Sequence, residues 1–154
     1  MIKKKIILDL DVITVAEWDK KEIAIKFINR VKFGEFEIFT PYSFFDLLDK
    51  WKYEKLKKKI KRFYELYSEE IITPQRLTEK LEGLKINEKI ISNDILRIQV
   101  KEEDILLVII TSMFNLDYLV TMNRKHLKNK MEVINDILQK HKLNPIKIVL
   151  PDEI

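Results

Sequence analysis

The chain has 154 residues, no cysteine and a formal net charge of +4 at pH 7. This length is sufficient for one domain with its own hydrophobic core, and we expect a single domain over residues 1–154. The absence of cysteine excludes disulfides, thiolate nucleophiles and thiolate metal sites. The mildly basic charge is compatible with a polyanionic partner without requiring one.

The N-terminal segment predicts a protein that is not inserted in a membrane. Lysines near the start are followed by an apolar run that is too short for a signal peptide or a membrane span, and the run ends in aspartate. We therefore expect a soluble, cytoplasmic protein with no membrane partner. Its richness in Lys, Glu and Ile is typical of thermophile proteins.

Five short β-type segments alternate with longer segments of helical period. Strands separated by helices form a parallel sheet that is covered on both faces. The pattern therefore predicts an α/β fold, a three-layer αβα sandwich with a five-stranded, mainly parallel central sheet. The predicted strands are 5–9, 37–40, 70–73, 118–121 and 146–150.

Capping signals predict where the crossover helices begin. Asp19 and Glu22 resemble a capping box, and Gly34 fits the position after a helix end, so the first crossover helix lies between them. Two Thr-Pro pairs, at 40–41 and 73–74, directly follow predicted strands. Threonine is a frequent N-cap and proline fits the first helical position, so each pair predicts a helix that begins at its proline.

A long, lysine-rich helix is predicted to begin near Tyr53. Residues 50–62, around its start, include eight basic residues and one acid. Such a basic surface can contact a phosphate backbone or can be an ordinary solvated surface. Its single apolar seam can also mediate dimerisation. The candidate RNA contacts are Lys57, Lys58 and Lys59, and the seam consists of Leu56, Ile60, Phe63 and Tyr67.

Residues 105–110 are six consecutive apolar residues, which fit either a strand or a helix. The acids at 102–104 are typical of a first helical turn, and Asn115 fits a helix end before the fourth strand. We therefore predict a helix with Asp104 at its N-terminal end.

Carboxylates and one amide are predicted to meet at one edge of the sheet, because open parallel sheets bind ligands outside the carboxyl ends of their strands. Asp9 and Asp11 end the first predicted strand, and Asp46 lies in the helix after the second. Asn123 follows the fourth strand, and Asp104 begins the helix that leads into it. This set of oxygen ligands favours Mg²⁺ or Mn²⁺.

Five segments taken together resemble the PIN domain, the nuclease fold of VapC-type toxins and related RNA-processing enzymes. The resemblance covers nearly the whole chain, with the motifs in the right order. Its most specific piece is the turn Thr121-Met122-Asn123 before His126-Leu127. The segments are ILDLDVI, FTPYSFFDLL, EEDILLVII, YLVTMNRKHL and IKIVLP.

This resemblance implies a metal-dependent endoribonuclease that leaves 5′-phosphate ends. Asp9 matches the first invariant acid and Asp104 the third, and both are expected to bind Mg²⁺ or Mn²⁺ directly. Asp46 matches an acid that is usually glutamate, and Asn123 matches a position held by Asp or Asn. These two are expected to be ligands or water-positioning groups. Asp11 either binds metal or holds the site together.

The resemblance also implies partners. These are an RNA substrate, a second copy in a homodimer, and an antitoxin protein if the enzyme is the toxin of a toxin-antitoxin pair. Arg124 joins the three lysines as a candidate RNA contact. Toxin and RNA-processing roles use the same acids, and the sequence leaves both open.

Two other functions remain open. Asp46 is one methylene shorter than the glutamate that the family usually has, and Asp49, one turn further on, is the other candidate for that position. The 105–110 segment is also bulky where the family is often alanine-rich. These features also fit a catalytically degenerate PIN fold that binds RNA or protein. The triplet Asp9-Leu10-Asp11 matches the nucleophile motif of haloacid-dehalogenase-like phosphatases, although Ile13 stands where that motif has Thr or Val.

Overall fold

The computed structural model describes residues 2–154 and contains a five-stranded sheet in which every strand pair is parallel. The order of strands across the sheet is β3-β2-β1-β4-β5. All five predicted strands are confirmed, and the sheet predicted to be mainly parallel is parallel throughout. The bounds are β1 (Lys4–Leu8), β2 (Phe36–Pro41), β3 (Ser68–Ile72), β4 (Tyr118–Val120) and β5 (Ile148–Val149).

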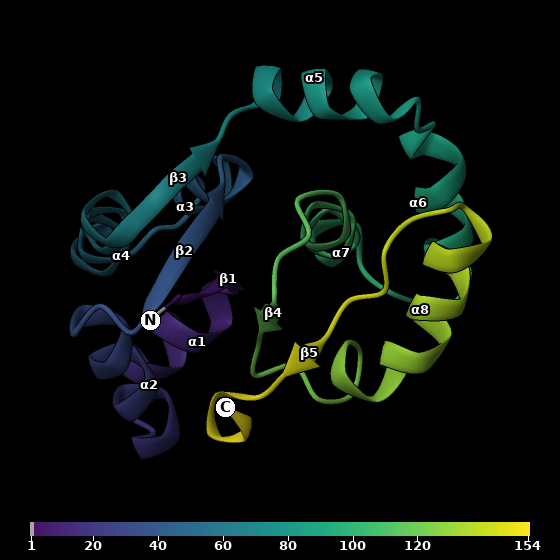
Figure 1. Cartoon of the computed structure of the whole chain (residues 1–154). Coiled ribbons are helices and arrows are strands. Elements are labelled where there is room, and N and C mark those ends of the chain that lie inside the picture. Colours follow the sequence, from purple (N-terminus) through teal and green to yellow (C-terminus); the bar gives the residue numbers. More distant parts are fainter. Residues whose placement is uncertain (1) are drawn as a thin grey trace.

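Helices cover both faces of the sheet, as right-handed crossovers between parallel strands require. Figure 1 shows α7 beside β1 and β4 on one face, with α2 and α4 on the other. The predicted three-layer αβα sandwich is therefore confirmed. The helices are α1 (Leu10–Thr14), α2 (Glu22–Lys32), α3 (Ser43–Asp49), α4 (Glu54–Tyr67), α5 (Pro74–Leu84), α6 (Glu88–Leu96), α7 (Glu102–Met113) and α8 (Met131–Lys140), with a π-helical turn η1 (Val15–Asp19) and 3₁₀ turns η2 (Lys128–Lys130) and η3 (Pro151–Glu153).

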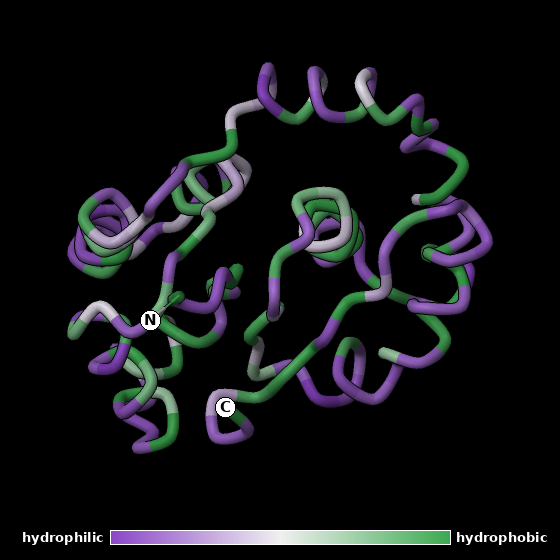
Figure 2. The backbone as a smooth tube through the Cα atoms, in the orientation of Figure 1, coloured by the Kyte–Doolittle hydropathy of each residue, from purple (hydrophilic) through white to green (hydrophobic). Residues whose placement is uncertain are grey.

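The core is centred on α7 and the strands beside it. Residues 105–110 are helical, as their acidic flank predicts, and within this run Leu106 alone is half-buried while the others are buried. A helix that is apolar on all sides must be enclosed, and α7 contacts β1, β4, α5 and α6. In Figure 2 α7 is mainly hydrophobic, whereas the outer helices alternate. Within residues 2–154 no helix combines the length and apolar character needed to cross a bilayer.

The chain becomes helical directly after β1, well before the predicted start of the first crossover helix. α1 continues into η1, and α2 begins only at Glu22. The predicted capping box is wrong, because Asp19 ends η1 and the N-cap of α2 is Lys21, which makes no side-chain capping bond. Gly34 does follow the end of α2, with a φ of 80° that favours glycine.

Only the second Thr-Pro pair begins a helix at its proline. Thr73 is the N-cap of α5, and its hydroxyl accepts a backbone N–H bond of 3.2 Å. The helix start predicted at the first pair is wrong, because Pro41 ends β2 and α3 begins at Ser43. The Thr40 hydroxyl instead lies 2.6 Å from that of Ser68, so it links β2 to the start of β3.

The apolar seam of α4 packs against the core of its own chain. Ile60 and Phe63 are buried, and Leu56 and Tyr67 are half-buried. Tyr64, which lies outside the predicted seam, is completely buried. Because the seam is used inside the molecule, it offers no exposed face for dimerisation.

Candidate active site

The sheet has its topological switch point between β1 and β4. From β1 the chain builds the sheet outward to β3, then returns to the other side of β1 and adds β4 and β5. The connections that leave β1 and β4 therefore turn to opposite faces and leave a crevice at the carboxyl ends of these strands. Doubly wound sheets bind their ligands in this crevice.

A cavity of about 380 Å³ opens at the switch point. Its walls come from the segment after β1, the start of α3, the N-terminal end of α7 and the loop after β4. Four side chains that were predicted from the sequence line it, namely Asp9, Asp11, Asp104 and Asn123. A fourth carboxylate, Glu103, also lies in its wall.

Asp9 directly follows β1 and is 8% exposed. Its backbone N–H donates to the Val120 carbonyl of β4 (2.9 Å), and its Oδ2 accepts from the Thr121 hydroxyl (2.9 Å). Burial raises the pKa of Asp9 well above its ordinary value, and the charges of Asp11 and Asp104 raise it further. The site therefore favours a proton or a cation at this carboxyl group.

Asp11 lies in the first turn of α1 and holds the loop that leaves β4. Its two oxygens accept from the Met122 N–H at 3.1 and 3.2 Å, and Oδ2 also accepts from the Thr121 hydroxyl at 3.1 Å. Burial raises the pKa of Asp11, while these hydrogen bonds oppose the rise. The contacts favour the second of its two predicted roles, which is to hold the site together.

The fully buried Thr121 hydroxyl lies between these two carboxylates. It also accepts from the Asn123 N–H at 3.0 Å. A hydroxyl has a single hydrogen, so Asp9 and Asp11 compete for one donor. Sequence patterns identify Thr121 only as part of a motif. Its role could have been inferred from its position. Thr121 follows a buried strand, and that strand is expected to lie beside the strand that ends in Asp9 and Asp11.

Asp104, in the first turn of α7, is 9% exposed, and its Oδ2 lies 3.5 Å from the Asn123 Nδ2. Burial, with the charges of Asp11 and Glu103, raises the pKa of Asp104 to about 6, although Lys101 opposes the rise. Asp104 therefore keeps its proton to a higher pH than an ordinary aspartate.

The amide of Asn123 is oriented by its own turn. Its Oδ1 accepts from the His126 N–H at 3.0 Å, which directs the NH₂ group toward Asp104. Asn123 thus presents a donor to the cavity, while its oxygen is already used. Of its two predicted roles, positioning fits this geometry better than metal ligation.

Tyr64 supports the site from beneath. Its hydroxyl donates to the Leu8 carbonyl at 2.8 Å and so holds the end of β1 immediately before Asp9. Complete burial raises the pKa of Tyr64 well above its ordinary value, and the charges of Asp9 and Asp11 add to the rise. Tyr64 was not predicted from the sequence, because the apolar seam of this helix was assigned to Ile60, Phe63 and Tyr67 instead.

Asp46 is not brought into the cavity. It is exposed on α3, whereas that helix lines the cavity through Ser43, Phe44 and Leu47. At about 100° per residue, Asp46 falls outside the arc that these three positions cover. Its rival Asp49 is also exposed and pairs with Lys61.

The four predicted RNA contacts lie outside the cavity walls. Lys57 pairs with Glu54 at 2.9 Å, and Lys59 pairs with Glu17 of η1 at 2.5 Å, so two of the lysines are already engaged within the protein. Lys58 and Arg124 are exposed. Contact between these residues and RNA remains a prediction.

The donors that face the cavity suit a hydrated divalent cation better than a closed cage. Within residues 2–154 no three His, Cys, Asp or Glu side chains form a ready-made metal group. Asp11 is bound to the β4 loop and Glu103 is exposed, so Asp9 and Asp104 are the buried carboxylates left to face an ion. Mg²⁺ commonly keeps several waters and binds proteins through one or two carboxylates, so these residues fit it. None of the ion pairs in the described chain includes either acid.

A second cavity, of about 320 Å³, lies at the other end of α7. It is lined by the α5–α6 connection, the C-terminal end of α7 and the turn after α8. Ser112 in its wall is eight residues from Asp104, which is about 12 Å along a helix. This cavity is therefore separate from the acid cavity.

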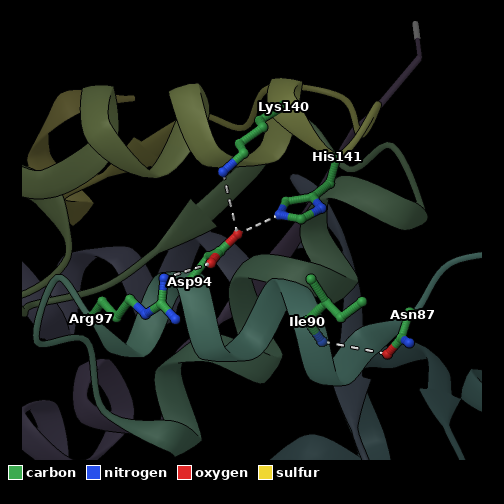
Figure 3. Close-up of polar contacts among 6 residues, drawn as sticks. All are labelled: Asn87, Ile90, Asp94, Arg97, Lys140 and His141. Carbon is green, nitrogen blue, oxygen red and sulfur yellow. Dashed lines mark hydrogen bonds and ion pairs between the residues drawn. The ribbon is translucent and has the colours of Figure 1, made fainter.

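An acid near the second cavity is paired with cations, unlike Asp9 and Asp104. Asp94 of α6 lies 2.7 Å from the His141 Nε2, and Lys140 and Arg97 are at 4.0 and 3.6 Å (Figure 3). The His141 hydrogen bond, with the charges of Lys140, His141 and Arg97, holds the pKa of Asp94 below its ordinary value. The cluster joins α6 to the end of α8, and its contacts indicate a structural role.

We predict that Asp94→Asn slightly lowers the thermal unfolding midpoint at neutral pH. Because the folded protein lowers the pKa of this acid, its contribution is present above about pH 4 and is lost as the carboxylate protonates at lower pH. Unfolding curves of the variant and the wild type should converge below that pH. An equal difference at every pH would contradict the ionic role.

The chain matches no protein-family model, no curated protein and no solved structure. The resemblance to the PIN domain therefore stays a prediction that rests on the motifs. The acids at the switch point are a separate observation, which comes from the geometry of this chain alone.

Proposed function

We propose that the protein is a metal-dependent endoribonuclease that hydrolyses RNA phosphodiester bonds at the switch-point cavity. The observation that carries this proposal is the meeting of Asp9, Asp11 and Asp104, all with raised pKa values, in one cavity. Buried carboxylates without a cation cost folding free energy, and perturbed acids in a cleft are typical of functional sites. The PIN-like motifs independently favour a nuclease.

In this proposal the predicted site residues in the cavity, with Lys101 and Thr121, have distinct roles. A bound Mg²⁺ or Mn²⁺ supplies a more acidic water and neutralises charge on the scissile phosphate. Asp9 and Asp104 hold the ion, and the Asn123 NH₂ group donates to a phosphate oxygen or positions water. Lys101, also in the cavity wall, attracts the phosphate. Asp11 and Thr121 keep the two strand ends together.

The test compares two aspartates that were both predicted site residues, of which only Asp9 lines the cavity. Asp9→Asn should reduce Mg²⁺- or Mn²⁺-dependent cleavage of a labelled RNA by about a thousandfold or more, because it removes a charge that faces the ion. Asp46→Asn should stay within about threefold of the wild type, because Asp46 is exposed outside the cavity. EDTA should abolish cleavage by the wild type and by Asp46→Asn.

Other results would point to the alternative functions. Wild-type protein that binds Mn²⁺ through Asp104 but cuts no RNA would disprove catalysis and leave a binding module. Trapping with fluoroberyllate would instead indicate a phosphatase that forms an aspartyl-phosphate. If Asp46→Asn loses activity as Asp9→Asn does, α3 must present Asp46 to the site in the working enzyme.

The partners implied by the motifs belong to the same proposal. RNA is the substrate, and an antitoxin protein would cover the acid cavity if the enzyme is a toxin. A homodimer would be detected by light scattering of the purified protein. An antitoxin that covers the cavity should shield Asp104 from solvent, and it should stop RNA cleavage without removing the metal.

A further inference from the structure

A shallow aromatic groove adjoins the acid cavity. Its volume is about 370 Å³, and it includes Trp18, Trp51 and Tyr53 in its walls. Thr14 and Trp51 line both the groove and the acid cavity, so the two spaces share a wall. The chain has two tryptophans, and both face this groove.

The outer part of the groove presents two aromatic rings to solvent. Trp18 is 55% exposed and Tyr53 is 61% exposed, and their ring centroids are 4.9 Å apart. Isolated exposed apolar residues are ordinary, but here two rings from separate elements, η1 and the start of α4, meet on the surface. Trp18 lies in a π-helical turn, and π-helical turns are frequent at functional sites.

The groove is bordered by positive charge. Lys52 lines the groove, and Lys20 and Lys55 line an adjoining hollow that shares Trp18 and Tyr53 with it. These three lysines make none of the ion pairs found in residues 2–154. The acids of the adjoining hollow, Glu17 and Glu54, are each paired with a lysine already. A ligand with flat apolar groups and negative charges complements such a surface. Single-stranded nucleic acid has both, in its bases and its phosphates.

We propose that Trp18 and Tyr53 form a stacking site for unpaired bases of an RNA strand, whose phosphates contact the bordering lysines. The strand then passes along Trp51 toward Asp9 and Asp104. This inference rests on the proposed function, because it assigns the substrate contacts of the same site. A duplex keeps its base faces covered, so double-stranded RNA should bind this groove poorly.

The experiment measures binding without cleavage, using Asp9→Asn protein in EDTA and a short, unstructured, labelled RNA. Single-stranded RNA should quench the tryptophan fluorescence, because both tryptophans face the groove. Adding Trp18→Leu should weaken binding about tenfold or more, since leucine is apolar but offers no ring face. Trp18→Phe should stay within about threefold of the parent, because it keeps an aromatic face.

A matched control is available at the end of α2. Phe33 is 87% exposed and does not line the groove, so Phe33→Leu removes an exposed ring elsewhere and should leave binding unchanged. Tyr53→Leu provides a second variant within the site and should weaken binding as Trp18→Leu does. Thermal unfolding confirms that each variant is folded before its affinity is compared.

The outcomes separate this inference from the proposed function. Equal binding by Trp18→Leu and Trp18→Phe, or equal affinity for duplex and single strand, would overturn base stacking and indicate an apolar docking surface such as one for a peptide. If the predicted binding is found but wild-type protein does not cleave, the stacking site stands and the nuclease fails. If the wild type cleaves with a KM that Trp18→Leu leaves unchanged, the nuclease stands and the stacking site fails.

Discussion

Replacing Asp104 by asparagine should make the metal-free protein more stable at neutral pH while it abolishes metal-dependent cleavage. The pKa of Asp104 is raised to about 6, so its ionisation costs folding free energy. The folded protein binds this proton more tightly than the unfolded chain, and wild-type stability therefore falls as pH rises from about 4 to about 6. The carboxylate keeps partial contact with solvent, so we expect a gain on the order of 1–2 kcal/mol.

Urea unfolding in EDTA across this pH range measures the effect. The gain of Asp104→Asn should be greatest above pH 7 and should disappear below about pH 4, where both folded and unfolded wild type are protonated. Asp46→Asn serves as the control, because an exposed acid outside the cavity should give no comparable gain. A variant less stable than wild type at neutral pH would show that Asp104 is not an uncompensated buried charge.

Metal binding should reverse the order of stability. An ion that binds only the folded protein stabilises it by about 2.7 kcal/mol at a hundred times its dissociation constant. Mg²⁺ or Mn²⁺ should therefore raise the unfolding midpoint of the wild type and of Asp46→Asn, but not that of Asp104→Asn. An undiminished metal effect in Asp104→Asn would remove this residue from the ligand set.

Replacing Thr121 by valine should damage both stability and activity. Valine keeps the shape but removes the one hydroxyl that serves Asp9 and Asp11, and it leaves the Asn123 N–H without its acceptor. Loss of a partner for buried polar groups costs about 1–3 kcal/mol. The expected result is destabilisation of that size at neutral pH, with cleavage about ten- to a hundredfold slower because Asp9 is no longer oriented.

A pH profile distinguishes this positioning role from simple loss of structure. The Thr121 hydrogen bond lowers the pKa of Asp9 against the effect of burial, so its removal should move the acid limb of the cleavage profile to higher pH. Thr121→Ser keeps the hydroxyl and should retain the wild-type limb. Equal profiles for the valine and serine variants would mean that Thr121 acts only as a packing residue.

The sequence predicts the meeting of Asp9, Asp104 and Asn123 because topology alone brings them together. Parallel strands end at one edge, and a helix that feeds the next strand must begin near that edge. Acidic flanking residues were also sufficient to identify α7, although its apolar run is ambiguous by period. These inferences depend on the order of elements and tolerate errors of a residue or two at their ends.

The position of Asp46 could not be predicted in the same way, because it depends on the rotation of a helix. The sequence places a helix start at Pro41, but β2 continues through that residue and α3 begins at Ser43. Two residues correspond to about 200° of turn about a helix axis, so an error of this size in the helix start changes the direction predicted for Asp46. Ion pairs such as Lys59 with Glu17 were equally hidden, since they join segments whose spacing in the chain carries no signal.

The bond between Asp11 and the Met122 N–H joins groups that are 111 residues apart. A contact of such long range can form only when both segments of the chain are present. A nascent chain on the ribosome carries its first aspartates long before β4 has been synthesised. Whatever chemistry the acids perform is therefore withheld until nearly the whole polypeptide has been made.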